Sequence, residues 1–133
     1  DLEHPVMQQI RKEHNSDVLI IDLSKFDKWT DIIDQICSCE CIASSSLHGL
    51  ITSDAYGVPN CWVELFGIIT GGHFKFYDYA SSVNRTFNGP ITMHTDIDKL
   101  IEECKKWTQP TINHSDILKS CPFNIKAEQV ISK

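Results

Sequence analysis

The residues best suited to chemistry are the six of Ser-Ser-Ser-Leu-His-Gly, at positions 44–49. They lie between a short apolar run, residues 41–44, and a segment with helical apolar spacing. If Ser45 or Ser46 caps that helix, its hydroxyl satisfies one N–H group of the first turn. The other N–H groups point outward where the helix dipole is positive, so the junction suits a phosphate or carboxylate. Ser44 would add a further hydroxyl. A plain serine-rich cap without a ligand is the alternative interpretation.

His48 and Gly49 extend this candidate anion site. His48 falls in the first turn, off the apolar stripe of Leu47 and Leu50. Gly49 would leave room for a ligand to approach the backbone. A serine nucleophile is disfavoured, because the Gly-x-Ser-x-Gly frame of a nucleophile elbow is absent. A first-turn histidine that only forms hydrogen bonds stays open as the structural alternative.

A second group of reactive side chains lies in residues 71–85, after two consecutive glycines. Its polar members are His73, Lys75, Asp78, Tyr79 and Arg85. Two phenylalanines, Phe74 and Phe76, would anchor it. Without other information we expect this segment to be a surface loop, and loops of this kind often carry functional residues.

The chain has six cysteines, and three of them alternate in Cys37-x-Cys39-x-Cys41. That segment joins a helix to a strand and lacks paired C-x-x-C spacing, so we expect no metal site there. Each cysteine falls in a core-like pattern, and a domain of this size needs no cross-links. We therefore predict reduced, buried thiols in a cytoplasmic protein.

Strands and helices are expected to alternate along the chain. Helical spacing of apolar residues predicts helices at residues 4–15, 27–37, 47–55 and 114–121. A fifth helix is expected to begin after Thr95 as its N-cap, with Asp98 in the capping-box position. Short apolar runs predict strands at residues 17–24, 41–44, 61–66 and 90–93. Gly57 supplies a left-handed stop after the third helix. This order predicts a single Rossmann-like three-layer α/β/α domain with a parallel sheet, in which ligands bind at the carboxyl ends of the strands.

Composition excludes several classes of partner. The 133 residues carry 12 basic and 18 acidic side chains, a net charge of -6, with no basic block. Nucleic acid and anionic membrane surfaces are therefore not expected as partners, and no apolar run is long enough for a membrane span. A small anionic ligand remains compatible, because backbone N–H groups bind anions without formal charge.

Two segments resemble the carboxyl-terminal half of the polysaccharide pyruvyl transferase family. They are SSSLHGLITSDAYGVPN and, after an aromatic strand, FKFYDYASSVNR, within residues 43–85 or about a third of the chain. Members transfer the enolpyruvyl carbons of phosphoenolpyruvate onto sugar hydroxyls as a pyruvate ketal. The resemblance implies the second domain of a fold of the GT-B glycosyltransferase type, preceded by an amino-terminal domain that is not in this chain.

By the same resemblance, His48 is the expected catalytic residue, and no cofactor is expected. Phosphoenolpyruvate and a saccharide acceptor would be the partners. The expected substrate-binding residues are Ser44, Ser45, Ser46, Gly49, Lys75, Asp78 and Arg85. Many members carry arginine where this chain has Ser46, and Lys75 or Arg85 would then supply the positive charge.

Two other functions use the same helix start. A GT-B glycosyltransferase would bind the diphosphate of a nucleotide sugar there. A non-catalytic Rossmann-like binding module is the alternative outside enzymes.

Overall fold

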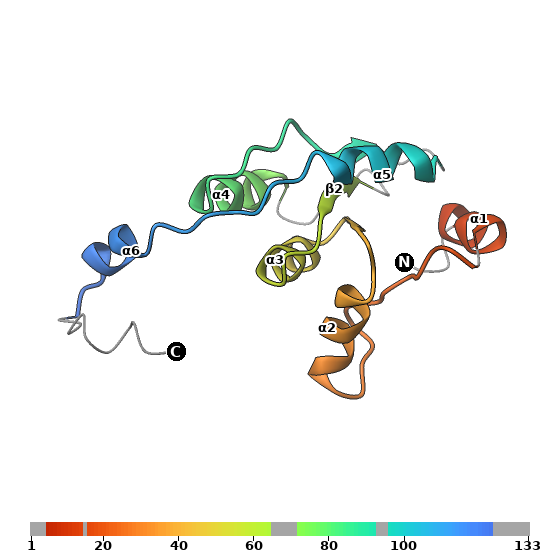
Figure 1. Cartoon of the computed structure of the whole chain (residues 1–133), viewed down its shortest axis with the longest axis horizontal. Coiled ribbons are helices and arrows are strands. Elements are labelled where there is room, and N and C mark those ends of the chain that lie inside the picture. The colour runs from red at the N-terminus through yellow and green to blue at the C-terminus, as the bar shows by residue number, and fades with distance from the viewer. Residues whose placement is uncertain (1–4, 15, 65–71, 93–95, 124–133) are drawn as a thin grey trace.

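The computed structural model describes residues 5–14, 16–64, 72–92 and 96–123 (Figure 1). The helices in these ranges are α1 (Pro5–Glu13), α2 (Trp29–Cys37), α3 (Leu47–Ala55), α4 (Phe74–Ser82), α5 (Ile97–Lys105) and α6 (His114–Ser120). The strands are β1 (Ile42–Ser44), β2 (Asn60–Glu64) and β3 (Ile91–Thr92).

The three strands form one parallel sheet in the order β1-β2-β3. Ser44 at the end of β1 pairs with Trp62, and Glu64 at the end of β2 pairs with Thr92. The predicted α/β class and parallel sheet are therefore confirmed. Positions 65, 66 and 93, also predicted as strand, lie outside the described residues.

Strand β2 is buried on both faces, which explains its continuous apolar sequence. One face packs on α5 through a cluster of Cys61, Val63, Leu100 and Cys104. The opposite face packs on α3 and α4 through Leu50, Trp62 and Phe76. Helices thus cover both sides of the central strand.

Helix α3 ends as the sequence predicts. Gly57 has a φ of 71°, the left-handed conformation that glycine adopts without strain. The Val58 N–H then donates to the Ser53 carbonyl at 2.8 Å and turns the chain into β2.

The predicted strand at residues 17–24 is wrong. Residues 18–22 are not helical and form no strand ladder with any described residue. Val18, Ile20 and Ile21 are only half-buried there. An apolar run becomes a strand only when a neighbour supplies hydrogen bonds, and no described strand pairs with this run.

The predicted loop at residues 71–85 is also wrong, because most of it is helix α4. Phe76, Ala80 and Val83 are buried at helical spacing, while Phe74 is 76% exposed. In the sequence, the two glycines and the many aromatic residues made the helical spacing of these buried residues hard to recognise.

At α5, the N-cap is Asp96, whose carboxylate accepts from the Lys99 N–H at 3.2 Å. Thr95, the predicted cap, lies outside the described residues.

The cysteines are free thiols, as predicted, but they are not all buried. Cys61 and Cys104 are buried, whereas Cys37 is exposed at the end of α2. Burial raises the pKa of the Cys41 thiol to about 11, and hydrogen bonding to Cys61 together with burial raises that of Cys104. These shifts disfavour the thiolate and make the two thiols poor nucleophiles.

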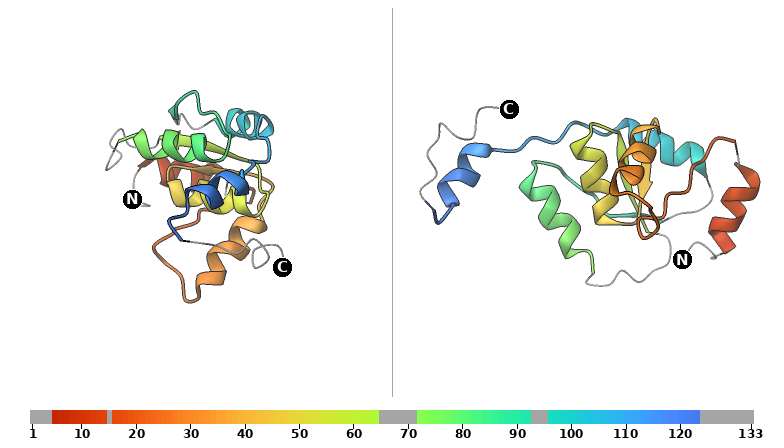
Figure 2. Two further views of the ribbon diagram at one scale, coloured as in Figure 1. Left: turned by 90° about the vertical axis from the view of Figure 1, so that its left-hand side faces the viewer. Right: turned by 90° about the horizontal axis from the view of Figure 1, so that it is seen from below.

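The two ends of the described chain stand away from the sheet. Helix α6 lies apart at one end of the molecule and α1 at the other (Figures 1 and 2). No residue of α6 is buried. None of the helices that the structure describes combines the length and apolar composition that a membrane-spanning segment requires.

Candidate functional site

The turn from β1 into α3 is closed by Ser44. Its hydroxyl donates to the Ser46 carbonyl at 2.9 Å and accepts from the Ser46 N–H at 3.1 Å. Ser46 is the N-cap of α3, yet its side chain makes no capping hydrogen bond. The prediction that Ser45 or Ser46 is the N-cap residue is therefore confirmed by Ser46, but the predicted hydrogen bond from a first-turn N–H to its hydroxyl is wrong. Ser44 is half-buried and its hydroxyl is already used inside the turn, which leaves it less suited to hold a ligand.

The predicted space above Gly49 is filled by the protein itself. A Cβ at Gly49 would lie 2.3 Å from Ser44 Oγ and 3.1 Å from Ser44 Cβ. Gly49 is buried and lets α3 approach β1 closely. The prediction that a ligand approaches the backbone here is therefore wrong, and glycine serves helix-to-strand packing.

The open part of the helix start consists of Ser45, Ser46 and His48. Ser45 and His48 are exposed and Ser46 is half-buried. Among the described residues, the structure gives no acceptor for the backbone N–H groups of Leu47 and His48. These first-turn donors lie at the positive end of the helix dipole, where backbone N–H groups can donate to an anion; the predicted anion site stays a prediction.

Helix α4 carries two of the other predicted substrate-binding residues, Lys75 and Asp78. Lys75 and Asp78 are exposed on it, and the Lys75 ammonium lies 5.4 Å from the centre of the Phe76 ring. At its start, His73 Nε2 lies 3.4 Å from Glu64 Oε1. Glu64 is the last residue of β2, so this contact ties α4 to the carboxyl edge of the sheet.

Trp62 connects the two predicted segments. It pairs with Ser44 across the sheet, stacks on Phe76 with ring centres 4.3 Å apart, and meets the His73 ring edge-on at 5.0 Å. The helix start after β1 and the start of α4 therefore lie at the same edge of the sheet. Sequence reasoning did not assign Trp62 or Glu64 to the site, because their partners lie on other elements.

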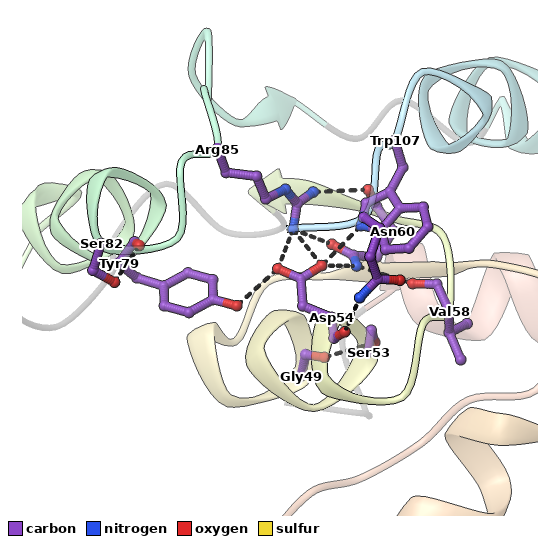
Figure 3. A network of polar contacts seen from close by, with 10 residues as sticks. Gly49, Ser53, Asp54, Val58, Asn60, Tyr79, Ser82, Arg85 and Trp107 are labelled. Carbon is purple, nitrogen blue, oxygen red and sulfur yellow. Dashed lines mark hydrogen bonds and ion pairs between the residues drawn. The ribbon is translucent and has the colours of Figure 1, made fainter. Parts of the chain in front are cut away.

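Arg85 is part of a buried network around Asp54 rather than an open cation (Figure 3). Its Nη1 donates to both Asp54 carboxylate oxygens at 2.7 and 2.6 Å and to Asn60 Oδ1 at 2.9 Å. The Arg85 side chain is 9% exposed and that of Asp54 is 3% exposed. The guanidinium charge is thus already neutralised, and we assign Arg85 a structural role in place of the predicted substrate contact.

Three further donors saturate the Asp54 carboxylate. The Tyr79 hydroxyl donates at 2.8 Å, Asn60 Nδ2 at 2.7 Å and Trp107 Nε1 at 2.8 Å. Burial and the hydrogen bond to Asp54 raise the pKa of Tyr79 well above its usual range. The network joins α3, β2, α4 and the chain after α5, so it sets how α4 sits on α3. One feature of the sequence indicates that Asp54 is buried: it falls at i+4 from Leu50, on the apolar stripe of its helix.

The described residues contain no group of three histidine, cysteine or carboxylate side chains that could hold a metal ion.

The comparisons with known proteins give one relative of undetermined role. The chain is 40% identical over 70 residues to "Uncharacterized protein L143" of Acanthamoeba polyphaga mimivirus, a match that covers 52% of this chain. The chain spans about a quarter of the length of that protein, 24%. No protein-family model and no solved structure matches the chain.

Proposed function

We propose that this chain is the carboxyl-terminal, Rossmann-like domain of a polysaccharide pyruvyl transferase with a GT-B type architecture. In this proposal it binds phosphoenolpyruvate and acts in the cytoplasm, with a saccharide as acceptor. The observation that carries the proposal is the convergence of the two family-like segments. Trp62 pairs with the end of β1 and packs on α4, so the segments containing His48 and Lys75 meet at one edge of the sheet.

The groups at this edge match what phosphoenolpyruvate needs. Its phosphate and carboxylate would take the N–H groups of the α3 start and the hydroxyls of Ser45 and Ser46. Lys75 supplies a positive charge where family members use arginine. Asp78, one turn along α4, orients Lys75 or a sugar hydroxyl. His48 contacts the anion and donates a proton to the methylene carbon.

Ligand-dependent melting tests the choice of ligand. Phosphoenolpyruvate is expected to raise the melting temperature of the full-length protein, because a ligand that binds only the folded state stabilises it. UDP is expected to leave it unchanged, and the reverse pattern would identify a nucleotide-sugar glycosyltransferase. With one wall of the cleft, this chain alone is expected to bind phosphoenolpyruvate weakly and to give no turnover.

His48→Ala tests the residue assignment. In the full-length protein we expect ketal formation to fall by about 10²–10⁴-fold, the range for loss of a general acid. His114→Ala, at the exposed start of α6, is the matched control and should keep full activity. Unchanged ketal formation in His48→Ala would show that His48 has no catalytic role.

A further inference from the structure

A second histidine, His73, has the surroundings of a proton-transfer residue. Its Nε2 lies 3.4 Å from Glu64 Oε1, and its ring meets the Trp62 ring edge-on with centres 5.0 Å apart. The His73 side chain is 40% exposed and that of Glu64 is 19% exposed. A mostly buried carboxylate thus holds one nitrogen of an imidazole that is still open to solvent.

The contact with Glu64 decides which nitrogen of the ring can accept a proton. An ionised carboxylate only accepts hydrogen bonds, so with a neutral ring this contact is a hydrogen bond only in the tautomer that carries the proton on Nε2. Nδ1 then carries the free lone pair, and the structure gives it no partner among the described residues. Carboxylate–histidine pairs in hydrolases fix the tautomer of a catalytic base in the same way.

The pair lies beside the α3 start. Ser44 is opposite Trp62, and Glu64 is two residues further along β2. With about 3.3 Å per residue and about 4.8 Å between strands, the Cα atoms of Ser44 and Glu64 are roughly 8 Å apart. A substrate the size of phosphoenolpyruvate, with the attacking hydroxyl beside it, spans that separation.

The same cluster contains an unsatisfied polar atom. Trp62 is 2% exposed, and its Nε1 has no hydrogen-bond partner among the described residues. A buried donor without an acceptor is unusual in a structure that serves packing alone. The side chains packed around His73 therefore include one buried donor that no described residue pairs.

We infer that His73, oriented by Glu64, is the general base that accepts the proton of the attacking sugar hydroxyl. This inference rests on the proposed function. The hydroxyl oxygen bonds to C2 of phosphoenolpyruvate while its proton passes to His73 Nδ1, and C3 takes a proton from His48. The C2–O bond to phosphate then breaks, and its electron pair leaves with the phosphate. A second hydroxyl closes the ketal on C2, and its proton ends on the departed phosphate as hydrogen phosphate.

His73 and His48 thus divide the two proton transfers. His73 touches the reacting hydroxyl and is a catalytic residue. Glu64 acts through His73 and is a positioning residue, because it fixes the tautomer without contacting the substrate.

The first experiment determines the tautomer of His73 and needs no catalytic activity. Long-range ¹H–¹⁵N NMR spectra of the histidine rings at alkaline pH are recorded for the wild-type protein and for Glu64→Gln. We expect His73 to be the Nε2–H tautomer in the wild type and a mixture of tautomers in Glu64→Gln. A wild-type His73 with its proton on Nδ1 would overturn the inference, whatever the protein catalyses.

The second experiment measures phosphate release and ketal formation from phosphoenolpyruvate with saccharide acceptors in the full-length protein. We expect His73→Gln to lower kcat by about 10²–10⁴-fold with the KM for phosphoenolpyruvate within about threefold. His114→Gln is the control, and Glu64→Gln should lose less than His73→Gln. If wild type turns over and both His73→Gln and Glu64→Gln keep its kcat, the base assignment is overturned and the transferase stands. If wild type neither binds phosphoenolpyruvate nor turns it over, the proposed function fails and the base role falls with it.

Discussion

Substituting Asp54 by asparagine tests the buried network most directly. The change keeps the side-chain shape and removes the charge. It leaves the Arg85 guanidinium, which is 9% exposed, without a counter-ion; its other partners among the described residues are Asn60 and the face of the Phe87 ring. The asparagine also points its amide NH₂ group at the donors of the network, each of which needs a hydrogen-bond acceptor. Breaking a buried ion pair in this way costs about 3–5 kcal/mol, against about 0–1 kcal/mol for an exposed pair.

That cost is large for a domain whose total stability is about 5–15 kcal/mol. At roughly 3–5 °C per kcal/mol for a chain of this size, the melting temperature should fall by about 10–20 °C. Urea unfolding gives the free energy directly, provided that the m-value stays the same. Asp34→Asn, exposed on α2, is the matched control and should change stability by less than about 0.5 kcal/mol.

The double variant Asp54→Asn/Arg85→Gln separates two costs: the loss of the ion pair itself, and the burial of an arginine charge that has no counter-ion. Because it removes the unpaired guanidinium, its cost should be smaller than the sum of the two single costs by about 1–3 kcal/mol. A loss below 1 kcal/mol for Asp54→Asn, or additive costs in the cycle, would refute the reasoning that this carboxylate holds the segments together.

Three other substitutions or treatments test separate features. The pKa of Tyr79 is raised from its ordinary value of 10.0, so the unfolded chain loses this proton first and the stability from it should disappear as pH rises above 10. Urea unfolding from pH 9 to 11.5 should therefore show a shallower alkaline decline in Tyr79→Phe than in wild type. Gly49→Ala places a Cβ 2.3 Å from Ser44 Oγ and should cost about 1–3 kcal/mol in the same assay, with part of that recovered in Gly49→Ala/Ser44→Ala. Iodoacetamide followed by peptide mass spectrometry should label the exposed Cys37 well before the buried Cys104; equal rates would contradict the observed burial.

The fold could be predicted where local pattern and tertiary context agree. Apolar spacing located α2, α3 and α5, and continuous apolar runs located β1 and β2. The run at residues 17–24 has the same composition as a buried strand, but the pairing that makes a strand lies outside the run itself. Helix α4 was not predicted because the exposed aromatic residues Phe74 and Tyr77 interrupt the helical spacing of its buried residues.

The site could be predicted as a location but not as a set of contacts. The serines and His48 do lie at the carboxyl end of a parallel strand. Sequence could not tell that Ser44 closes the turn, that Gly49 packs on it, or that Arg85 pairs with Asp54. Each of those contacts joins residues whose polar groups look equally available along the chain, and only the packing of α3, β2 and α4 decides which are used.

The Asp54 network also bears on the order in which the chain folds. Its donors come from residues 60, 79, 85 and 107, and Gln109 Nε2 donates to the Asp54 backbone carbonyl at 3.1 Å. The Asp54 carboxylate is synthesised before all of these partners, and the last of them are made about 55 residues later, which corresponds to several seconds of translation. Until then the Asp54 carboxylate lacks the Trp107 donor, although Asn60, Tyr79 and Arg85 are already synthesised. Docking of α4 and of the chain after α5 should therefore occur together and late, as a single cooperative step that depends on contacts distant in sequence.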